Sequence, residues 1–237
     1  AKDTFNEEDY KLLFYQTGLG KPAIDELKEM SGNFAETVLK FQDNFFRKID
    51  FICEKNSPIS REESVIDNNG NYIAGTDIAS IHNGYILLTK SSHTYGWRNG
   101  HAALVIDAAR GKTLESVVLG TKSCIQSIDK WTNYPNFILM RPKNVPLDLL
   151  EEIAQSASEI LRDVDYDLFT GIFSLKNKKP GNVNGTYCSH LVWQAFKFFG
   201  IDLDSDGGII VTPKDIAKSP YLEIVQVYGV DPGNIWP

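Results

Sequence analysis

The stretch TYCSHLVWQAFKFFG, residues 186–200, decides how this sequence is interpreted. It begins where a polar loop rich in Gly and Asn, residues 181–185, gives way to the apolar periodicity of a helix that ends at Gly200. Cys188 therefore lies at the start of the predicted helix, beside backbone N–H groups that have no partner inside it. Because the helix dipole and these N–H groups both favour thiolate over thiol, the pattern predicts a cysteine nucleophile at residue 188.

A nucleophilic cysteine needs a base, and the sequence offers histidines at four positions. His190 follows Cys188 by two residues, about 200° around a helix, so its side chain is expected to point away from the thiol. His101 opens the predicted strand HAALVID directly after Gly100, where the missing Cβ allows another element to approach closely. We therefore predict His101 as the base, the alternative being a strand-end histidine that is only hydrogen-bonded.

Glu115 is the expected third member, a polar residue inside the apolar strand pattern of residues 113–119. A short loop joins this strand to the strand of His101, and a turn centred near residue 109 places residue i opposite roughly 218 minus i. Glu115 then faces Ala103 and lies diagonal to His101, where a carboxylate can accept the Nδ1–H of the imidazole and orient it. The alternative is a glutamate that faces solvent.

The secondary structure that the sequence predicts changes near residue 76. Residues 1–75 are predicted as a helical N-terminal region, with helices over 7–17, 22–30 and 33–52 and a linker or exposed loop over 56–76. Residues 76–237 contain strand patterns, at 85–89, 101–107, 113–119, 137–141 and 222–227. They also contain helix patterns, at 146–162, 188–200 and after Thr212-Pro213. This mixture predicts an α+β fold, with a second domain over 76–237.

The bulk composition argues against several functional classes. The net charge is −7 and no block of Lys and Arg stands out, so we expect no nucleic-acid partner. No run of about 18 apolar residues is present, so no transmembrane segment is expected. The sequence begins Ala1-Lys2-Asp3, as does a secreted protein cut after its signal peptide or a trimmed expression product. We take the first interpretation and expect a secreted or cell-envelope protein.

Two further features are expected to be structural. Cys53 and Cys124 are expected to be small buried side chains, although a bridge between them that leaves Cys188 free is an open alternative. Residues 202–207, DLDSDG, copy the first six positions of an EF-hand loop, but the twelfth position is Pro213 where a glutamate is needed. We therefore expect a solvated acidic turn there, and neither a metal nor a cofactor in the protein.

The order of these motifs resembles the circularly permuted NlpC/P60 papain-like cysteine peptidases and amidases, in particular the YiiX/YebB-like group. The resemblance covers roughly residues 78–225 and rests on YILLTK, NGHAALVID, TLESVV, FILMRPK, TYCSHLVWQAF and VTPKDIAKSP. Ordinary members run from the cysteine to the histidine to a polar residue, whereas His101, Glu115 and Cys188 follow the permuted order. The pair Asn83-Gly84 departs from the Gly-Asp that usually precedes the first strand of the family.

This resemblance implies a fold and a chemistry. The fold is a permuted papain-like core, with a small antiparallel sheet or barrel packed on the Cys188 helix and residues 1–75 beside it. The chemistry is hydrolysis of amide bonds in short or cell-wall peptides, with Cys188 as nucleophile, His101 as base and then acid, and Glu115 orienting His101. The backbone N–H of Cys188 and the side chain of Tyr187 are the expected oxyanion donors.

The sequence leaves the class of substrate undecided. The loop 91–99, SSHTYGWRN, mixes hydroxyls, aromatics and Arg98, which suits a peptide with charged ends. The alternatives are an N-acyl amide hydrolase or acyltransferase acting on lipid-like substrates, and an inactive binding module. An apolar groove lined by residues 169–175 and by Phe45, Phe46 and Phe51 would favour lipid, but we expect these side chains to pack in the core.

Overall fold

The computed structural model describes residues 5–30 and 32–237, and within them the chain folds into helices and two antiparallel sheets, an α+β fold. The strands are β1 (Asp50–Lys55), β2 (Ser60–Ile66), β3 (Ile86–Thr89), β4 (Ser92–Thr94), β5 (His101–Asp107), β6 (Lys112–Glu115), β7 (Cys124–Ser127), β8 (Phe137–Pro142) and β9 (Leu222–Tyr228). The helices are α1 (Glu7–Thr17), α2 (Lys21–Glu29), α3 (Phe34–Phe46), α4 (Asp129–Thr132), α5 (Leu147–Ile160), α6 (Cys188–Lys197) and α7 (Pro213–Ala217). The N-terminal residues 1–3, on which the expectation of secretion rests, and Ser31 lie outside the described residues.

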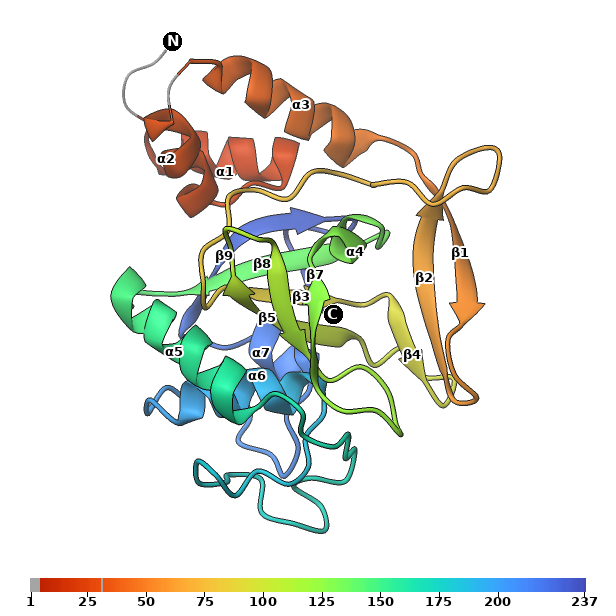
Figure 1. Ribbon diagram of the computed structural model, residues 1–237. Helices are drawn as coiled ribbons and strands as arrows, with labels where there is room; N and C mark the ends of the chain where they lie inside the picture. Colours follow the sequence, from red (N-terminus) through yellow and green to blue (C-terminus); the bar gives the residue numbers. More distant parts are fainter. Residues whose placement is uncertain (1–4, 31) are drawn as a thin grey trace.

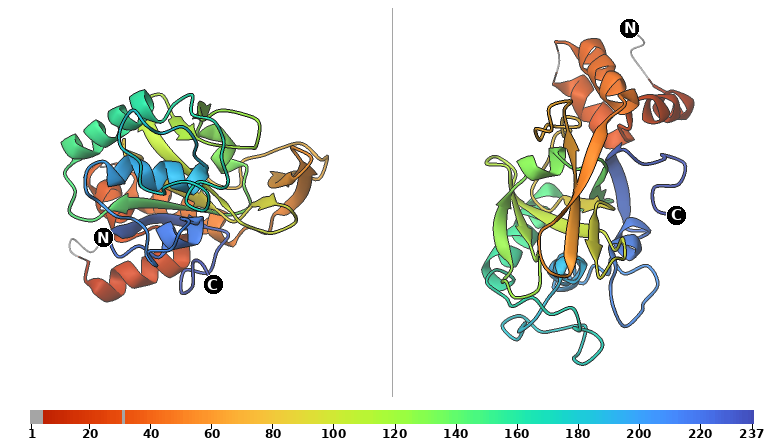
Figure 2. Two further views of the ribbon diagram at one scale, coloured as in Figure 1. Left: turned by 90° about the horizontal axis from the view of Figure 1, so that it is seen from below. Right: turned by 90° about the vertical axis from the view of Figure 1, so that its right-hand side faces the viewer.

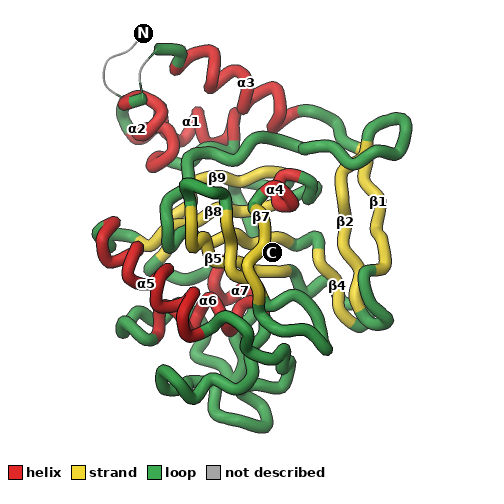
Figure 3. The backbone as a smooth tube through the Cα atoms, in the orientation of Figure 1, coloured by secondary structure: helices red, strands yellow, loops and turns green. Residues whose placement is uncertain are grey.

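The large sheet has the strand order β7-β6-β5-β3-β8-β9 and forms the centre of the molecule, as Figure 1 shows. Helices α5 and α6 pack against β5, while α1, α2 and α3 gather at the far end of the molecule, beyond β9. The small sheet, of order β1-β2-β4, projects to one side in Figure 1 and in the left view of Figure 2. Figure 3 shows that the long loops on either side of α6 gather at the end opposite α1–α3.

Helix α6 is the most deeply buried helix of this arrangement. Every residue from Ser189 to Phe196 is buried, because the helix lies between the sheet, α5 and α7. Strands β3 and β5 cover it with uninterrupted apolar runs, which is the pattern of strands that are buried on both faces. The predicted strands and helices of residues 85–228 are found at their expected places, apart from the predicted strand 113–119, which ends at Glu115.

The predicted helical region of residues 1–75 is correct only for its first two thirds. Helix α3 ends at Phe46, and residues 50–55, expected to continue it, form β1, which pairs with β2 inside the predicted linker. Ile49 and Ile52 continue the helical spacing of Phe34, Val38, Phe41 and Phe45, which concealed the strand. The antiparallel partner supplied by β2 decides the outcome, because pairing satisfies the backbone groups of both segments.

The cysteines differ from expectation in the same region. Cys53 lies exposed on β1 and Cys124 is partly exposed on β7, so neither is the buried side chain that was predicted. Each of the three cysteines is free, which removes the alternative of a Cys53–Cys124 bridge.

The turn between α1 and α2 is fixed to β9 by its backbone. The Val227 N–H donates to the Gly18 carbonyl, and the Gly20 N–H donates to the Val225 carbonyl. Gly18 has φ +73°, and a Cβ there would lie 2.1 Å from the Val227 carbonyl oxygen, so only glycine fits this contact. The N-terminal helices are therefore joined to the C-terminal strand.

Candidate active site

Strand β5 and the first turn of α6 bring His101 and Cys188 together. Ala102 and Ala103 are fully buried small residues on β5, so α6 packs close to the strand. Gly100 has φ +82°, and a Cβ there would lie 2.6 Å from the Thr89 carbonyl, which explains the glycine before the histidine. The Cys188 sulfur lies close enough to the His101 ring and to the backbone N–H of Ala102 for both to stabilise its thiolate.

Glu115 reaches the other side of the His101 ring. Leu104 pairs with Leu114 and Val105 with Thr113, which is the predicted register of the hairpin. His101 Nε2 and Glu115 Oε2 are 2.7 Å apart, so the nitrogen that faces the carboxylate is Nε2, not Nδ1 as expected. The diagonal placement explains the difference, because the outer nitrogen of the ring is the one that spans to Glu115.

Glu115 is fully buried and does not face solvent, which removes the second interpretation of this residue. Its Oε1 accepts the Thr113 hydroxyl at 2.6 Å and the Trp131 indole N–H at 3.1 Å, and its Oε2 lies 2.5 Å from Lys130 Nζ. The Trp131 ring also stacks on His101, with centroids 5.7 Å apart and an interplanar angle of 16°. Three neighbours therefore hold the carboxylate, and one of them also holds the imidazole.

Lys130 and Trp131 were not identified from the sequence. Both come from the single turn of α4, which follows β7. A Lys-Trp pair between two strand patterns carries no catalytic signature of its own. Only the pairing of β7 beside β6 brings α4 to the carboxylate.

The pKa values of the three groups follow from this geometry. Burial alone would lower the pKa of His101, but its hydrogen bonds to Cys188 and Glu115 outweigh burial and raise that pKa to about 9. Burial would raise the pKa of Glu115, but the His101 hydrogen bond and the Lys130 charge lower it to about 2. Burial opposes the Cys188 thiolate too, yet His101 and the Ala102 N–H bring the pKa of the thiol below its ordinary value. The arrangement favours a thiolate–imidazolium pair near neutral pH.

A cleft of about 340 Å³ opens at Cys188. Its walls come from the loop before β5, from the loop that precedes α6 and from the segment before α7. They are formed by Thr94, Trp97, Arg98, Asn99, Gly100, Tyr166, Leu168, Tyr187, Ser189, Ile210, Val211, Thr212 and Pro213. Cys188 is therefore reached from solvent through a space large enough for part of a small ligand.

Two tyrosines line this cleft. The Tyr187 hydroxyl accepts the Val211 N–H at 2.9 Å, which holds it at the cleft wall and leaves its own O–H to donate. The Tyr166 hydroxyl has no hydrogen-bond partner among the described residues. Burial raises the pKa of Tyr166, and the nearby negative charge of Cys188 raises it further, which keeps the phenol protonated as a donor. Tyr166 was missed because its place beside Cys188 depends on the bridge between residue 166 and Thr186.

His190 is fully buried away from the cleft, as its spacing predicted. Its Nδ1 lies 2.8 Å from the Thr186 hydroxyl and its Nε2 lies 2.8 Å from the Lys176 carbonyl oxygen. Burial lowers the pKa of His190 to about 4, so the ring is neutral at pH 7. It holds the loop 165–187 to α6.

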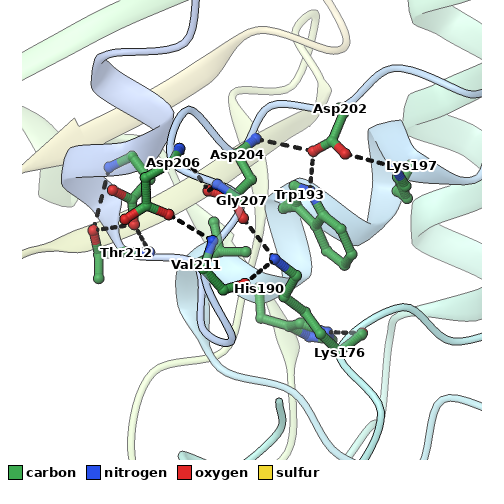
Figure 4. Close-up of polar contacts among 12 residues, drawn as sticks. Lys176, His190, Trp193, Lys197, Asp202, Asp204, Asp206, Gly207, Val211 and Thr212 are labelled. Carbon is green, nitrogen blue, oxygen red and sulfur yellow. Dashed lines mark hydrogen bonds and ion pairs between the residues drawn. The ribbon is translucent and has the colours of Figure 1, made fainter.

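The acidic turn of residues 202–207 is folded into the protein (Figure 4) and is less solvated than expected. Asp202 accepts the Trp193 indole N–H at 2.7 Å and pairs with Lys197 at 2.6 Å. Asp204, with a side chain only 1% exposed, pairs with Lys176 at 2.6 Å. Carboxylate oxygens of Asp204, Asp206 and Asp215 lie within 4.8 Å of one another.

Most of these oxygens already have donors, which gives the turn a structural explanation. Asp215 accepts the backbone N–H and the hydroxyl of Thr212 in the capping box of α7. Asp204 also accepts backbone N–H groups of the turn itself. That the protein needs no metal stays a prediction.

The chain is similar to one curated protein over a short stretch and to one solved structure over a longer one. No family model matches it. It is 44% identical over 53 residues to an uncharacterised protein, YycO, of Bacillus subtilis (strain 168), a match that spans 22% of each chain. Among solved structures, it is similar to the metalloprotein YiiX from Escherichia coli O157:H7, with a TM-score of 0.48 and 15% identity over 62% of this chain and 97% of YiiX. Among the described residues, no helix is long and apolar enough to cross a bilayer.

Proposed function

We propose that the protein is a cysteine hydrolase that cleaves amide bonds, of the permuted NlpC/P60 papain-like type. The observation that carries the proposal is the line of contacts from Cys188 through His101 to the buried Glu115, placed in the wall of an open cleft. A glutamate that served only stability would not need a buried imidazole between itself and a solvent-accessible thiol. Perturbed pKa values at such a place are typical of catalytic groups.

The reaction proceeds in two halves. The Cys188 thiolate attacks the carbonyl carbon, the C=O electron pair moves to the oxygen, and the backbone N–H of Cys188 stabilises the oxyanion together with Tyr166 or Tyr187. The imidazolium of His101 gives its Nδ1 proton to the leaving amine as the C–N bond breaks, which leaves a thioester. Water then attacks the thioester, His101 accepts its proton, and the acid leaves as the thiolate reforms. Glu115 keeps the ring oriented and stabilises its positive charge throughout.

For the substrate we favour a peptide that carries a free carboxylate, including peptides of the cell wall. Arg98 in the cleft wall supports this choice. Its Nε donates to the Lys90 carbonyl at 2.8 Å and one Nη donates to the buried carboxylate of Glu63 at 2.6 Å. The guanidinium is thereby fixed at the cleft, and its other N–H groups have no partner among the described residues, so they suit a substrate carboxylate.

A lipid-like N-acyl amide is the second candidate, because much of the cleft wall is apolar. Trp97, Leu168 and Ile210 line the same space as Cys188. An acyl chain of a few methylenes would be buried there by the hydrophobic effect. Acyl transfer to another acceptor follows the same first half-reaction, with the acceptor in place of water.

The test is kcat/KM on short peptides, on the same peptides with amidated C-termini, and on N-acyl amino acids of increasing chain length. We expect turnover of the free peptides, loss of at least about tenfold on amidation, and the same loss in Arg98→Gln. Arg162→Gln, which alters an exposed arginine paired with Asp163, serves as the matched control and should be unaffected.

A rate that rises roughly tenfold for every two methylenes would favour the lipid-like substrate instead. The absence of turnover on every substrate, together with equal binding to wild type and Cys188→Ala, would reject the enzyme in favour of a binding module.

A further inference from the structure

The loop that leads from α5 to α6 presents apolar side chains to solvent beside the cleft. Phe173 is 82% exposed and Leu175 is 80% exposed, and Phe169 and Ile172 are exposed as well. Ile209, from the loop between α6 and α7, lies against the same turn, since a Cβ on Gly171 would meet its carbonyl oxygen at 2.0 Å. We call these five residues, Phe169, Ile172, Phe173, Leu175 and Ile209, the apolar face. The four of them that belong to residues 169–175 were expected to pack in the core, and they are exposed to solvent instead.

The backbone under the apolar face is fixed by polar contacts. Thr170 is fully buried, and its hydroxyl lies 2.9 Å from an Asp167 oxygen and 3.2 Å from the Gly185 carbonyl. The Phe169 N–H donates to Asp167, and the Phe169 carbonyl accepts the N–H of Phe173. In this segment the polar side chain is inside and the aromatic side chains are outside, the reverse of the usual distribution in a water-facing turn.

Positive charge borders the apolar face. Lys176 forms an ion pair with Asp204. Lys178 and Lys179 follow within four residues of Leu175, and neither forms an ion pair with a described residue. The chain as a whole carries a net charge of −7, so cations at this edge stand out against the rest of the surface. Lys178 donates to the Asn184 side chain at 2.9 Å, and Asp167 is the acid whose charge acts on it.

The mouth of the cleft is continuous with the apolar face. Leu168 and Ile210 line the cleft with Cys188, and each is the direct chain neighbour of a residue of the face, Phe169 and Ile209. Figures 1 and 3 place both loops at the end of the molecule opposite α1–α3. A flat partner that covered the apolar face would therefore lie across the entrance to the active site.

We propose that the apolar face docks on the surface of an anionic phospholipid bilayer, with Phe173 and Leu175 in the interface and Lys178 and Lys179 at the phosphate groups. Aromatic and aliphatic side chains bordered by lysines are the pattern that binds such an interface. A lipid surface fits the observations better than a protein partner, because the exposed apolar side chains are flanked by cations, which an anionic surface attracts. The proposal concerns where the protein acts and holds whichever bond it cleaves.

Sedimentation with vesicles tests the proposal, using phosphatidylcholine alone or with about one third phosphatidylglycerol. We expect the protein to bind the anionic vesicles about 25-fold more tightly, since each lysine near such a surface contributes roughly 1 kcal/mol. Lys178→Gln with Lys179→Gln should remove that preference. Phe173→Ser with Leu175→Ser should weaken binding to both vesicles by at least about tenfold, because the apolar contact is lost.

Matched controls come from the opposite end of the molecule. Leu39 and Phe46 are apolar side chains that are also exposed, on α3. Leu39→Ser with Phe46→Ser should therefore leave binding to vesicles unchanged. Lys11→Gln with Lys48→Gln controls for loss of charge. Thermal unfolding and alkylation of Cys188 verify that each variant is folded with an intact site.

Three results would overturn the proposal. The first is no sedimentation of wild type with anionic vesicles at millimolar lipid. The second is equal binding by wild type and by the Phe173→Ser, Leu175→Ser variant. The third is a concentration-dependent dimer that this variant abolishes and that vesicles do not compete with, which would assign the apolar face to a second copy of the chain.

Discussion

Replacing Glu115 by glutamine removes one charge from the site and should change the protonation of His101. In the wild type, hydrogen bonds to Cys188 and Glu115 raise the pKa of His101 to about 9 against the effect of burial. A buried hydrogen bond to a charged group contributes about 1.5–3 kcal/mol, and 1.36 kcal/mol corresponds to one pKa unit. We therefore expect Glu115→Gln to bring the pKa of His101 down to between about 7 and 8.

The sign of the effect follows from the two protonation states. A raised pKa means that the imidazolium, and with it the thiolate–imidazolium pair, persists up to that pH and is lost above it as the ring gives up its proton. The alkaline limb of kcat/KM should therefore fall near pH 9 in the wild type and between about pH 7 and 8 in Glu115→Gln. The acid limb, set by protonation of Cys188, should move up, because a less basic partner stabilises the thiolate less.

The assay is the pH dependence of kcat/KM, with the rate of Cys188 alkylation by iodoacetamide as a second readout that needs no substrate. Lys130→Gln is the contrasting variant, because it removes the cation that lies 2.5 Å from Glu115 and leaves the carboxylate ionised at neutral pH. Its alkaline limb should stay at pH 9 or rise. An unchanged limb in Glu115→Gln, or a fall of equal size in Lys130→Gln, would refute the account of how Glu115 acts on His101.

Three other outcomes are expected. Below pH 7, brief treatment with iodoacetamide followed by mass mapping should find Cys188 labelled before the exposed Cys53. The reason is that His101 and the Ala102 N–H stabilise the thiolate of Cys188. Labelling of Cys53 first would contradict this prediction. His101→Ala should abolish turnover while His190→Ala, measured where thermal unfolding shows it folded, should retain most of it, and the opposite result would show that the wrong histidine was chosen. Tyr166→Phe should lower kcat by roughly 10–100-fold with little change in KM if its hydroxyl stabilises the oxyanion, and an unaffected kcat would return that role to Tyr187.

The sequence predicted the parts of the site that depend on local pattern. The start of α6 at Cys188 follows from helix periodicity, and the approach of Glu115 to His101 follows from the length of one hairpin loop. The helical repeat also predicts that the side chain of His190 points away from Cys188. These features involve segments that are close in the chain, where spacing alone limits the geometry.

Features that depend on tertiary packing were not predicted. The contribution of Lys130 depends on the position of β7 at the edge of the sheet, which brings α4 to Glu115. Strand β1 was predicted as helix because its apolar residues continue the spacing of α3 and its partner lies further along the chain. The exposure of Phe173 could not be foreseen, because an apolar residue in a sequence gives no sign of whether the fold will cover it.

The attachment of the α1–α2 turn to β9 has a consequence for synthesis on the ribosome. Gly18 and Gly20 emerge early, but their hydrogen-bond partners on Val225 and Val227 are made close to the end of the described chain. At roughly 5–20 residues per second, the intervening segment takes between about 10 and 40 s to translate. Until then α1 and α3 can pack on each other, but α2 lacks the strand against which it lies in the folded protein. A nascent chain that ended between residues 188 and 222 would contain the proposed catalytic residues and still lack the strand against which α2 packs, which would expose it to chaperones and proteases.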